Sequence, residues 1–226
     1  MNERLIWLLG DKLEMIKNKT VLIIGLGGVG SYALETLART CFNKLIIVDN
    51  DTIDVTNLNR QLMSNIDNVG KYKTDVWEDR IKKINPNCNV VKVTEFINKN
   101  NLKDLFKETV DYVIDACDTL ETKKEIIKYC LQHKIKFISS LGMANRIDAT
   151  KVKFSYLDKT AYDPLAKKLR LLLRKENIKG KIPVIYSEEI PIKNIKLGSI
   201  AHVPATAGLL CTNYIINDIL KGVSNE

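Results

Sequence analysis

The sequence lacks the paired cysteines that would form a structural zinc site or a disulfide framework. Its five cysteines are scattered over 226 residues, and no two of them form a C-x-x-C pair. Isolated cysteines of this kind argue against structural zinc and indicate thiols that stay reduced. We therefore expect a cytoplasmic protein without a zinc centre.

Long apolar runs and histidines are also scarce. No stretch contains about 18 uninterrupted apolar residues, which predicts no membrane span and no membrane partner. The first residues carry acidic side chains within their apolar part, and we interpret them as mature protein rather than as a signal peptide. We expect His133 on the surface at a helix end and His202 in a late loop, so no acid–base catalyst is evident.

What the chain does have is a large apolar fraction and an excess of positive charge. With 45% hydrophobic residues, it can bury the core of one α/β domain. The 35 basic and 27 acidic side chains leave a formal net charge of +8, which favours a polyanionic partner such as RNA or DNA. A lysine- and asparagine-rich background composition gives the same charge, and that alternative stays open.

Strand-like apolar runs alternate with helical patterns along most of the chain. This order predicts an α/β fold with a Rossmann-like, mostly parallel sheet and helices on both faces. The rhythm changes at residue 151, so we expect one domain over 1–226 with a core, 1–150, and a C-terminal elaboration, 151–226. The predicted strands are 21–24, 45–48, 89–93, 112–114, 136–139, 151–157 and 183–187, and the predicted later helices are 69–84, 102–106, 121–132, 164–175 and 205–220.

The stretch 21–51 contains a glycine turn between a strand and a helix. Gly25, Gly27 and Gly30 satisfy G-x-G-x-x-G, and Asp49 ends the next strand. We expect Gly25 to permit the turn, Gly27 and Gly28 to let backbone N–H groups approach a phosphate, and the carboxylate to accept ribose hydroxyls. The pattern predicts a nucleotide site, and the glycines alone leave the nucleotide open.

Polar and basic residues follow that acid in a pattern that a redox domain does not need. Arg60 offers a planar donor fork to phosphate oxygens, and Lys73 adds a point charge on the next helix. Asp118 follows a later strand, at the edge where ligands bind, and could hold Mg²⁺ near the phosphates. The alternatives are solvated surface charges for the two cations and a helix N-cap for the acid.

Five motifs, in this order and spacing, resemble the ATP-binding core of the ubiquitin-activating-enzyme-like adenylating superfamily, which includes the molybdopterin- and thiamine-synthesis adenylyltransferases. The resemblance covers residues 4–146 and rests on GLGGVG, VDND, DVTNLNRQ, the lysine of GKYK, and DACD. Three later segments, 159–170, 184–189 and 198–200, resemble the tRNA threonylcarbamoyladenosine dehydratase family. With these segments, the resemblance covers nearly the whole chain.

The resemblance implies a reaction that uses ATP and Mg²⁺. The threonine carboxylate of threonylcarbamoyladenosine in tRNA would attack the α-phosphate of ATP. A nitrogen of the carbamoyl group would then close onto the activated carbonyl, AMP would leave, and a cyclic base would result with net loss of water. Adenylation suits this chemistry because a carboxylate is a poor electrophile until its oxygen becomes a good leaving group, and the developing phosphate charge calls for cations.

The resemblance also assigns residues to roles. Arg60, Lys73 and Asp118 would be catalytic, with Asp118 as the metal ligand, and Arg4 would reach the phosphates of the other subunit of a homodimer; an exposed helix arginine is the alternative. The expected ATP-binding residues are Gly25, Gly27, Gly28, Gly30, Asp49, Asp51, Asn57, Asn59, Arg60, Lys73, Asp118 and, on the adenine side, Thr119.

A basic segment between 159 and 181 lies outside the shared ATP core. We expect Lys167, Lys168, Arg170 and Arg174 to bind tRNA, because spacing of i, i+3 and i+7 puts three of these cations on one helix face. A solvated helix face is the alternative. Cys211 lies in an apolar helical pattern, which predicts a buried thiol rather than a covalent catalyst.

Three other functions remain open from sequence. The first is an adenylyltransferase that activates the C-terminal Gly-Gly of a ubiquitin-like sulfur carrier, with a sulfur-transfer partner. The missing zinc cysteines and the basic segment argue against it. The second is an NAD-dependent oxidoreductase, which does not need the pair Arg60 and Lys73. The third is a nucleotide-sensing module that binds tRNA without catalysis.

Overall fold

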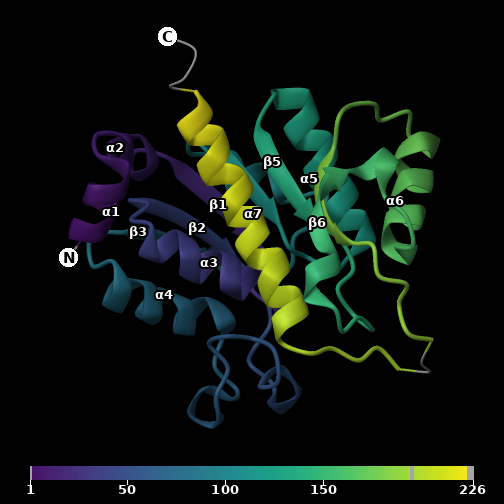
Figure 1. The fold of residues 1–226 in the computed structure, drawn as a ribbon, viewed down its shortest axis with the longest axis horizontal. Coiled ribbons are helices and arrows are strands. Elements are labelled where there is room, and N and C mark those ends of the chain that lie inside the picture. Colours follow the sequence, from purple (N-terminus) through teal and green to yellow (C-terminus); the bar gives the residue numbers. More distant parts are fainter. Residues whose placement is uncertain (1, 194–195, 223–226) are drawn as a thin grey trace.

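A seven-stranded sheet forms the centre of the computed structural model, which describes residues 2–193 and 196–222 (Figure 1). The strands lie in the order β3-β2-β1-β4-β5-β7-β6, and within the described residues only β6 runs antiparallel to its neighbour. Their bounds are β1 Thr20–Ile24, β2 Lys44–Val48, β3 Asn89–Val93, β4 Tyr112–Asp115, β5 Lys136–Ser140, β6 Val152–Tyr156 and β7 Pro183–Ser187.

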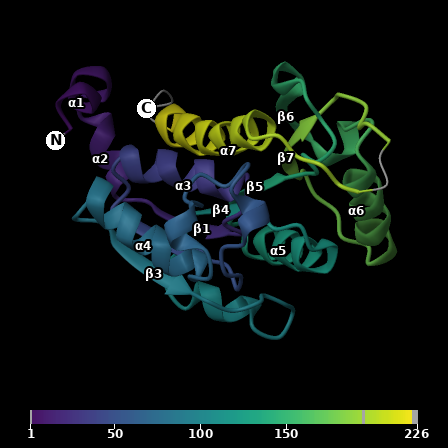
Figure 2. The same ribbon diagram turned by 90° about the horizontal axis from the view of Figure 1, so that it is seen from below.

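The central strands are buried on both faces, which explains their continuous apolar sequence. In β1, Val21 and Ile23 point into one core, whereas Leu22 and Ile24 point into the other. Helices cover both faces, as Figure 2 shows for α3 and α7 on one side and α5 on the other. The fold class expected from the sequence is therefore confirmed.

The first core is covered by α2 (Lys12–Lys17), α3 (Gly30–Arg39), α4 (Lys73–Ile84) and α7 (His202–Lys221), with α1 (Glu3–Leu9) before them. The second core is covered by α5 (Leu120–His133), α6 (Pro164–Lys175) and the 3₁₀ turn η3 (Leu102–Phe106). Four shorter 3₁₀ turns are η1 Val55–Asn57, η2 Ile66–Asn68, η4 Ala149–Lys151 and η5 Leu157–Lys159.

Two predicted helix starts differ from the structure. The helix predicted from residue 69 begins at Lys73, because Gly70 turns with a φ of +86° and Tyr72 is extended and bridges to Thr52. The last helix begins at His202, three residues before its predicted start. Pro204 is tolerated there because N–H groups in a first helical turn have no partner within the helix.

The two predicted parts of the chain build one sheet. Residues 1–150 supply β1 to β5, and residues 151–226 supply β6 and β7, with β7 paired to β5. This continuity supports the prediction of a single domain. None of the helices in the described ranges has the length and apolarity that crossing a bilayer requires.

The strand order reverses at β1, which lies between β2 and β4. The chain moves from β1 to one side and later returns to the other, so the loops after β1 and β4 diverge. Open α/β sheets bind ligands in the crevice that this divergence leaves outside the carboxyl ends of the strands. The crevice is therefore where the site is expected.

Candidate functional site

A large cleft occupies that crevice and has a volume of about 1470 Å³. Its lining falls into two sets of segments. We call residues 24–73, 95–97 and 116–122 of the lining the nucleotide half, and residues 140–146, 163–168, 191–193 and 197–199 the substrate half. Because pockets for drug-sized ligands are about 300–1,000 Å³, this cleft has room for two reactants side by side.

The glycines of the turn after β1 are of two kinds: at some a Cβ would clash with the chain itself, and at Gly27 it would not. Gly25 has a φ of +93°, and a Cβ there would lie 2.7 Å from the Ala116 carbonyl oxygen. A Cβ at Gly30 would lie 1.8 Å from the carbonyl oxygen of Gly25. The chain itself therefore excludes side chains at these two positions. At Gly27 a Cβ would meet no atom closer than Gln61 Nε2 at 3.8 Å, so the space over it is free for a ligand.

Asp49 holds the glycine turn as well as lining the cleft. Its Oδ2 accepts a hydrogen bond of 2.7 Å from the Leu26 backbone N–H, and its Oδ1 accepts one of 2.9 Å from Asp51. Each carboxylate oxygen has a second lone pair, so acceptance from a ribose remains open. The predicted ribose acid thus also fixes the shape of the phosphate turn.

Lys73 lies at the start of α4 and is only 4% exposed. Its ammonium lies 2.7 Å from Asp51 Oδ2 and 3.6 Å from Asp49 Oδ1. The sequence placed all three residues in one site, and the structure brings them together. These contacts hold the Lys73 side chain in the wall of the cleft that the glycine turn also lines.

The polar loop after β2 is shaped by Asn57. This side chain is buried, and its Oδ1 accepts the Asp54 backbone N–H at 3.2 Å, which closes a capping box on η1. Asn59 donates from Nδ2 to the Ser199 carbonyl at 3.0 Å, and Arg60 donates from Nη1 to the Thr56 carbonyl at 2.8 Å. Asn57 therefore supports the loop, and all three residues line the cleft.

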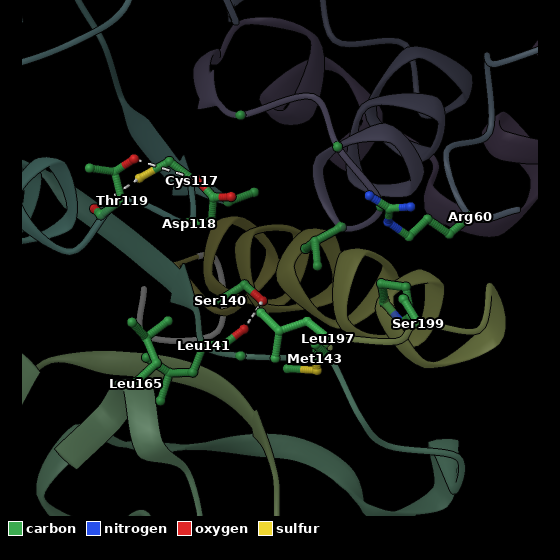
Figure 3. A pocket seen from close by; sticks show the side chains of 18 of the residues that line it. Arg60, Cys117, Asp118, Thr119, Ser140, Leu141, Met143, Leu165, Leu197 and Ser199 are labelled. Carbon is green, nitrogen blue, oxygen red and sulfur yellow. Dashed lines mark hydrogen bonds between the residues drawn. The ribbon is translucent and has the colours of Figure 1, made fainter. Parts of the chain in front are cut away.

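Asp118 is exposed at the cleft, on the turn between β4 and α5. Its nearest hydrogen-bonding contact in the described residues is the Thr119 hydroxyl at 3.5 Å. Thr119 is the N-cap residue of α5, and no side chain caps that helix, so the alternative of a capping role for Asp118 is wrong. Figure 3 shows Asp118 and Arg60 on opposite sides of the pocket.

A buried ion pair lies beneath this turn. Asp115 and Lys123 are both 0% exposed, and the ammonium lies 3.1 and 3.0 Å from the two carboxylate oxygens. Burial alone would lower the pKa of Lys123, but the adjacent carboxylate raises it above its ordinary value. Asp115 also accepts from the Ser139 hydroxyl at 2.6 Å and the Cys117 backbone N–H at 3.3 Å. The pair therefore fixes the turn that carries Asp118.

The sequence reasoning missed most of the substrate half. Ser140 is the last residue of β5 and Gly142 follows it, at the sheet edge where ligands bind, and that position was the available signal. Arg146 is 3% exposed and pairs with Asp163 at 3.4 Å. Its other donors reach the carbonyls of Gly142 and Glu189. This arginine ties the segments of the substrate half together.

Cys211 and His133 lie where the sequence predicts them, whereas His202 is the first residue of α7 and not part of a loop. Cys211 is 0% exposed in the first core, and burial raises its pKa to about 12. Cys117 lines the cleft, and burial together with Asp115 raises its pKa well above the ordinary value. His133 is exposed at the end of α5. His202 lies outside the cleft lining and meets the Ile147 carbonyl at 2.6 Å.

The basic residues of α6 divide between the surface and the fold. Lys167, Lys168 and Arg174 are exposed. Arg170 is half-buried and donates to the Leu157 and Thr160 carbonyls at 2.9 and 3.2 Å, so it holds η5 against α6. Contact with tRNA stays a prediction for the other three. Arg4 is exposed on α1 and lies outside the cleft lining of its own chain.

No preformed metal centre accompanies these residues. Among the described residues, no three His, Cys, Asp or Glu side chains gather closely enough to hold an ion. Mg²⁺ differs from zinc in that it often uses one or two carboxylates together with substrate phosphates and water. A single exposed carboxylate at Asp118 fits that mode of binding.

Comparison with known proteins places the chain in a family. A model of the ThiF family matches residues 4–222. The tRNA threonylcarbamoyladenosine dehydratase of Bacillus subtilis is 40% identical over 232 residues, covering 94% of this chain and 91% of that protein. A probable molybdopterin-synthase adenylyltransferase of Gracilaria tenuistipitata is 34% identical, but the match spans only 48% of that protein.

A solved structure gives the same result. The Escherichia coli tRNA N6-threonylcarbamoyladenosine dehydratase in complex with ATP matches with a TM-score of 0.94 and 33% identity. The match covers 99% of this chain and 95% of that one. Fold, identity and coverage thus agree with one group of relatives, and the dehydratase function expected from the sequence is confirmed. The chain belongs to the ThiF family and, within it, to the tRNA threonylcarbamoyladenosine dehydratases.

Proposed function

We propose that this protein dehydrates threonylcarbamoyladenosine in tRNA at the expense of ATP. The observation that carries the proposal is the open space over Gly27, in a cleft at the switch point of the sheet that Arg60 and Lys73 also line. The chain demands glycine at Gly25 and Gly30, but only a ligand demands it at Gly27. The Escherichia coli relative, whose structure was solved with ATP, supports ATP as that ligand.

Charge in the nucleotide half supports a bound Mg²⁺. Four carboxylates line this half, against the two cations Arg60 and Lys73, which leaves a net charge of about −2 beside a polyanionic nucleotide. The carboxylates are Asp49, Asp51, Glu95 and Asp118. Asp118 would hold the ion, since Asp49 and Asp51 are engaged with Lys73. When bound, Mg²⁺ would neutralise charge on the phosphate oxygens.

The reaction balances in two steps. The threonine carboxylate attacks the α-phosphorus of ATP, and pyrophosphate leaves. A carbamoyl N–H nitrogen then attacks the acyl carbonyl and gives its proton to solvent, AMP departs with one former carboxylate oxygen, and the ring closes. Arg60 and Lys73 stabilise the charge that develops on phosphate, and the two halves of the cleft hold the reactants together.

A homodimer would complete the site. On α1, Ile6, Trp7 and Leu8 are 52%, 77% and 78% exposed, and a helix with so much exposed apolar surface favours association. In such a dimer, Arg4 of one subunit would reach the phosphates bound by the other. The exposed cations of α6 would follow the tRNA backbone. Five free cysteines support a reducing, cytoplasmic location.

The decisive experiment incubates the protein with ATP, Mg²⁺ and tRNA that carries threonylcarbamoyladenosine. Mass analysis of the nucleosides should show the loss of one water, and AMP should accumulate in equal amount. Unmodified tRNA serves as the control and should release no AMP. An unchanged nucleoside, together with AMP release on a protein ending in Gly-Gly, would instead establish the sulfur-carrier adenylyltransferase.

A further inference from the structure

The two halves of the cleft have opposite charge. The nucleotide half carries four carboxylates and two cations, whereas the substrate half carries Asp163 against three cations, Arg146, Lys168 and Lys193. The substrate half thus has a net charge of about +2, which attracts an anion. A reactant that enters this half meets a field opposite to the one that surrounds the nucleotide.

The cations of the substrate half differ in whether they are free to meet a ligand. Arg146 is buried, and its guanidinium is used by Asp163 and by the carbonyls of Gly142 and Glu189. Lys168 is exposed and lines the cleft. Within the described residues its ammonium makes no ion pair and no hydrogen bond. Lys168 can therefore take an anion without giving up a contact.

The backbone under Lys168 is held firmly in place. Asp163 caps α6, because its Oδ1 accepts the Ala166 N–H at 2.9 Å, and its other oxygen pairs with Arg146. Ala166 and Leu169, on either side of the lysine, are 0% exposed in the second core. The lysine side chain is thus a flexible, strongly hydrated point charge on a fixed support.

Lys168 also differs from the other cations of α6. Lys167 and Arg174 are exposed but do not line the cleft, and Arg170 is bound to η5. In the described chain, α6 therefore directs one cation into the cleft and leaves the others outside it. This division separates contact with the reacting nucleotide from general attraction of the RNA backbone.

We propose that Lys168 binds an oxyanion of the RNA substrate inside the cleft and so determines which nucleotide is accepted. The inference rests on the proposed function and deepens it. The oxyanion is either the threonine carboxylate or a backbone phosphate next to the modified base. Both are recognised by the same charge-assisted hydrogen bond.

The test compares Lys168→Met with two matched variants, Lys167→Met on the same helix and Lys103→Met on η3, outside the cleft. Binding of threonylcarbamoyladenosine-modified tRNA is measured with a non-hydrolysable ATP analogue present. We expect Lys168→Met to weaken binding about tenfold or more, because hydrogen bonds to charged groups are strong. Lys167→Met should weaken it about twofold, and Lys103→Met should have no effect. Lys168→Arg should largely restore binding.

Two further arms identify the anion. If Lys168→Met also raises the KM for the free threonylcarbamoyladenosine nucleoside, the anion is the carboxylate. If only tRNA binding suffers, and its salt slope falls by about one, the anion is a phosphate. An effect of Lys168→Met no larger than that of Lys167→Met overturns the proposal. Failure of the wild type to dehydrate the tRNA would overturn the reaction instead, because this binding comparison does not depend on turnover.

Discussion

The nucleotide half and the substrate half of the cleft are built in different ways. The nucleotide half is made of segments that follow β1, β2, β3 and β4 directly, and the glycine turn after β1 is fixed by its glycines and by a hydrogen bond to Asp49. The substrate half gathers separate segments from both parts of the chain, and a buried pair, Arg146 from the first part and Asp163 from the second, ties two of them together.

This difference separates the phosphate site, which relatives can share, from the substrate site, which can differ between them. Turns at strand ends place a phosphate site by backbone geometry, so relatives with different substrates keep it. Long connections place side chains, so they vary the substrate without disturbing the sheet. The acidic nucleotide half and the basic substrate half thus bring a metal-bound nucleotide and an anionic second reactant into one cleft.

The largest expected effect comes from the glycine turn that carries the nucleotide half. We expect Gly30→Ala to abolish folding or lower the melting temperature by more than about 10 °C, because the new Cβ would lie 1.8 Å from the Gly25 carbonyl oxygen. Gly142→Ala in the substrate half is the control, since its nearest neighbour would lie at 3.7 Å. Equal melting temperatures for both variants in a thermal scan would contradict this contrast.

A second prediction concerns the ion pair beneath Asp118. Lys123→Met should cost about 3–5 kcal/mol of unfolding free energy, because it leaves the Asp115 carboxylate buried without its cation. The double variant Lys123→Met/Asp115→Asn should lose less unfolding free energy than Lys123→Met and Asp115→Asn lose together. Urea denaturation of the two single variants and the double variant measures these losses. A purely additive result would show that the two side chains do not depend on each other.

The third prediction, smaller in effect, concerns turnover in variants of Arg60 and Asp118. Arg60→Ala and Asp118→Ala should each lower kcat/KM for ATP by about a hundredfold or more, because each removes charge from the site of phosphate chemistry. Their melting temperatures should stay close to that of the wild type, since both side chains lie at the cleft surface. Lys99→Ala, an exposed change outside the cleft, serves as the control. Wild-type kinetics in either variant would remove that residue from the site.

The smallest expected effect is a change in the rate at which the Cys117 thiol, in the nucleotide half, is alkylated. Because the pKa of Cys117 is raised, its thiolate fraction stays below that of an ordinary cysteine until the pH rises well above 9. Alkylation by iodoacetamide, followed by peptide mass analysis, should therefore be slow at pH 7 and increase with pH. Bound ATP should slow it further. Labelling at pH 7 as fast as that of a free thiol would contradict the burial, and Cys211 should stay unlabelled throughout.

The nucleotide half was readable from sequence because its residues stand at strand ends in fixed spacing. Gly25, Asp49, Lys73 and Asp118 line the cleft, as predicted from that spacing. Asn57 also lines the cleft, and its side chain closes a capping box on η1 as well, so its contact with ATP stays a prediction.

The substrate half and the buried charges were not readable in the same way. Arg146 and Asp163 pair across two segments, and no local pattern announces that contact. Lys123 lies among polar residues of a helix, which predicts a solvated side chain, but α5 directs it inward onto Asp115. Arg170 likewise turned from the expected RNA surface towards η5. In each case tertiary packing decides the orientation of a charged side chain.

The position of α7 has a consequence for the order of synthesis. This helix packs along α3 (Figure 1), and its first turn touches the glycine turn, where a Cβ at Gly28 would lie 3.2 Å from Pro204. A chain still held on the ribosome before residue 204 emerges has made every residue of the phosphate turn but not the wall behind it. The glycine turn therefore acquires its contact with Pro204 only after α7 has been synthesised and has packed on α3.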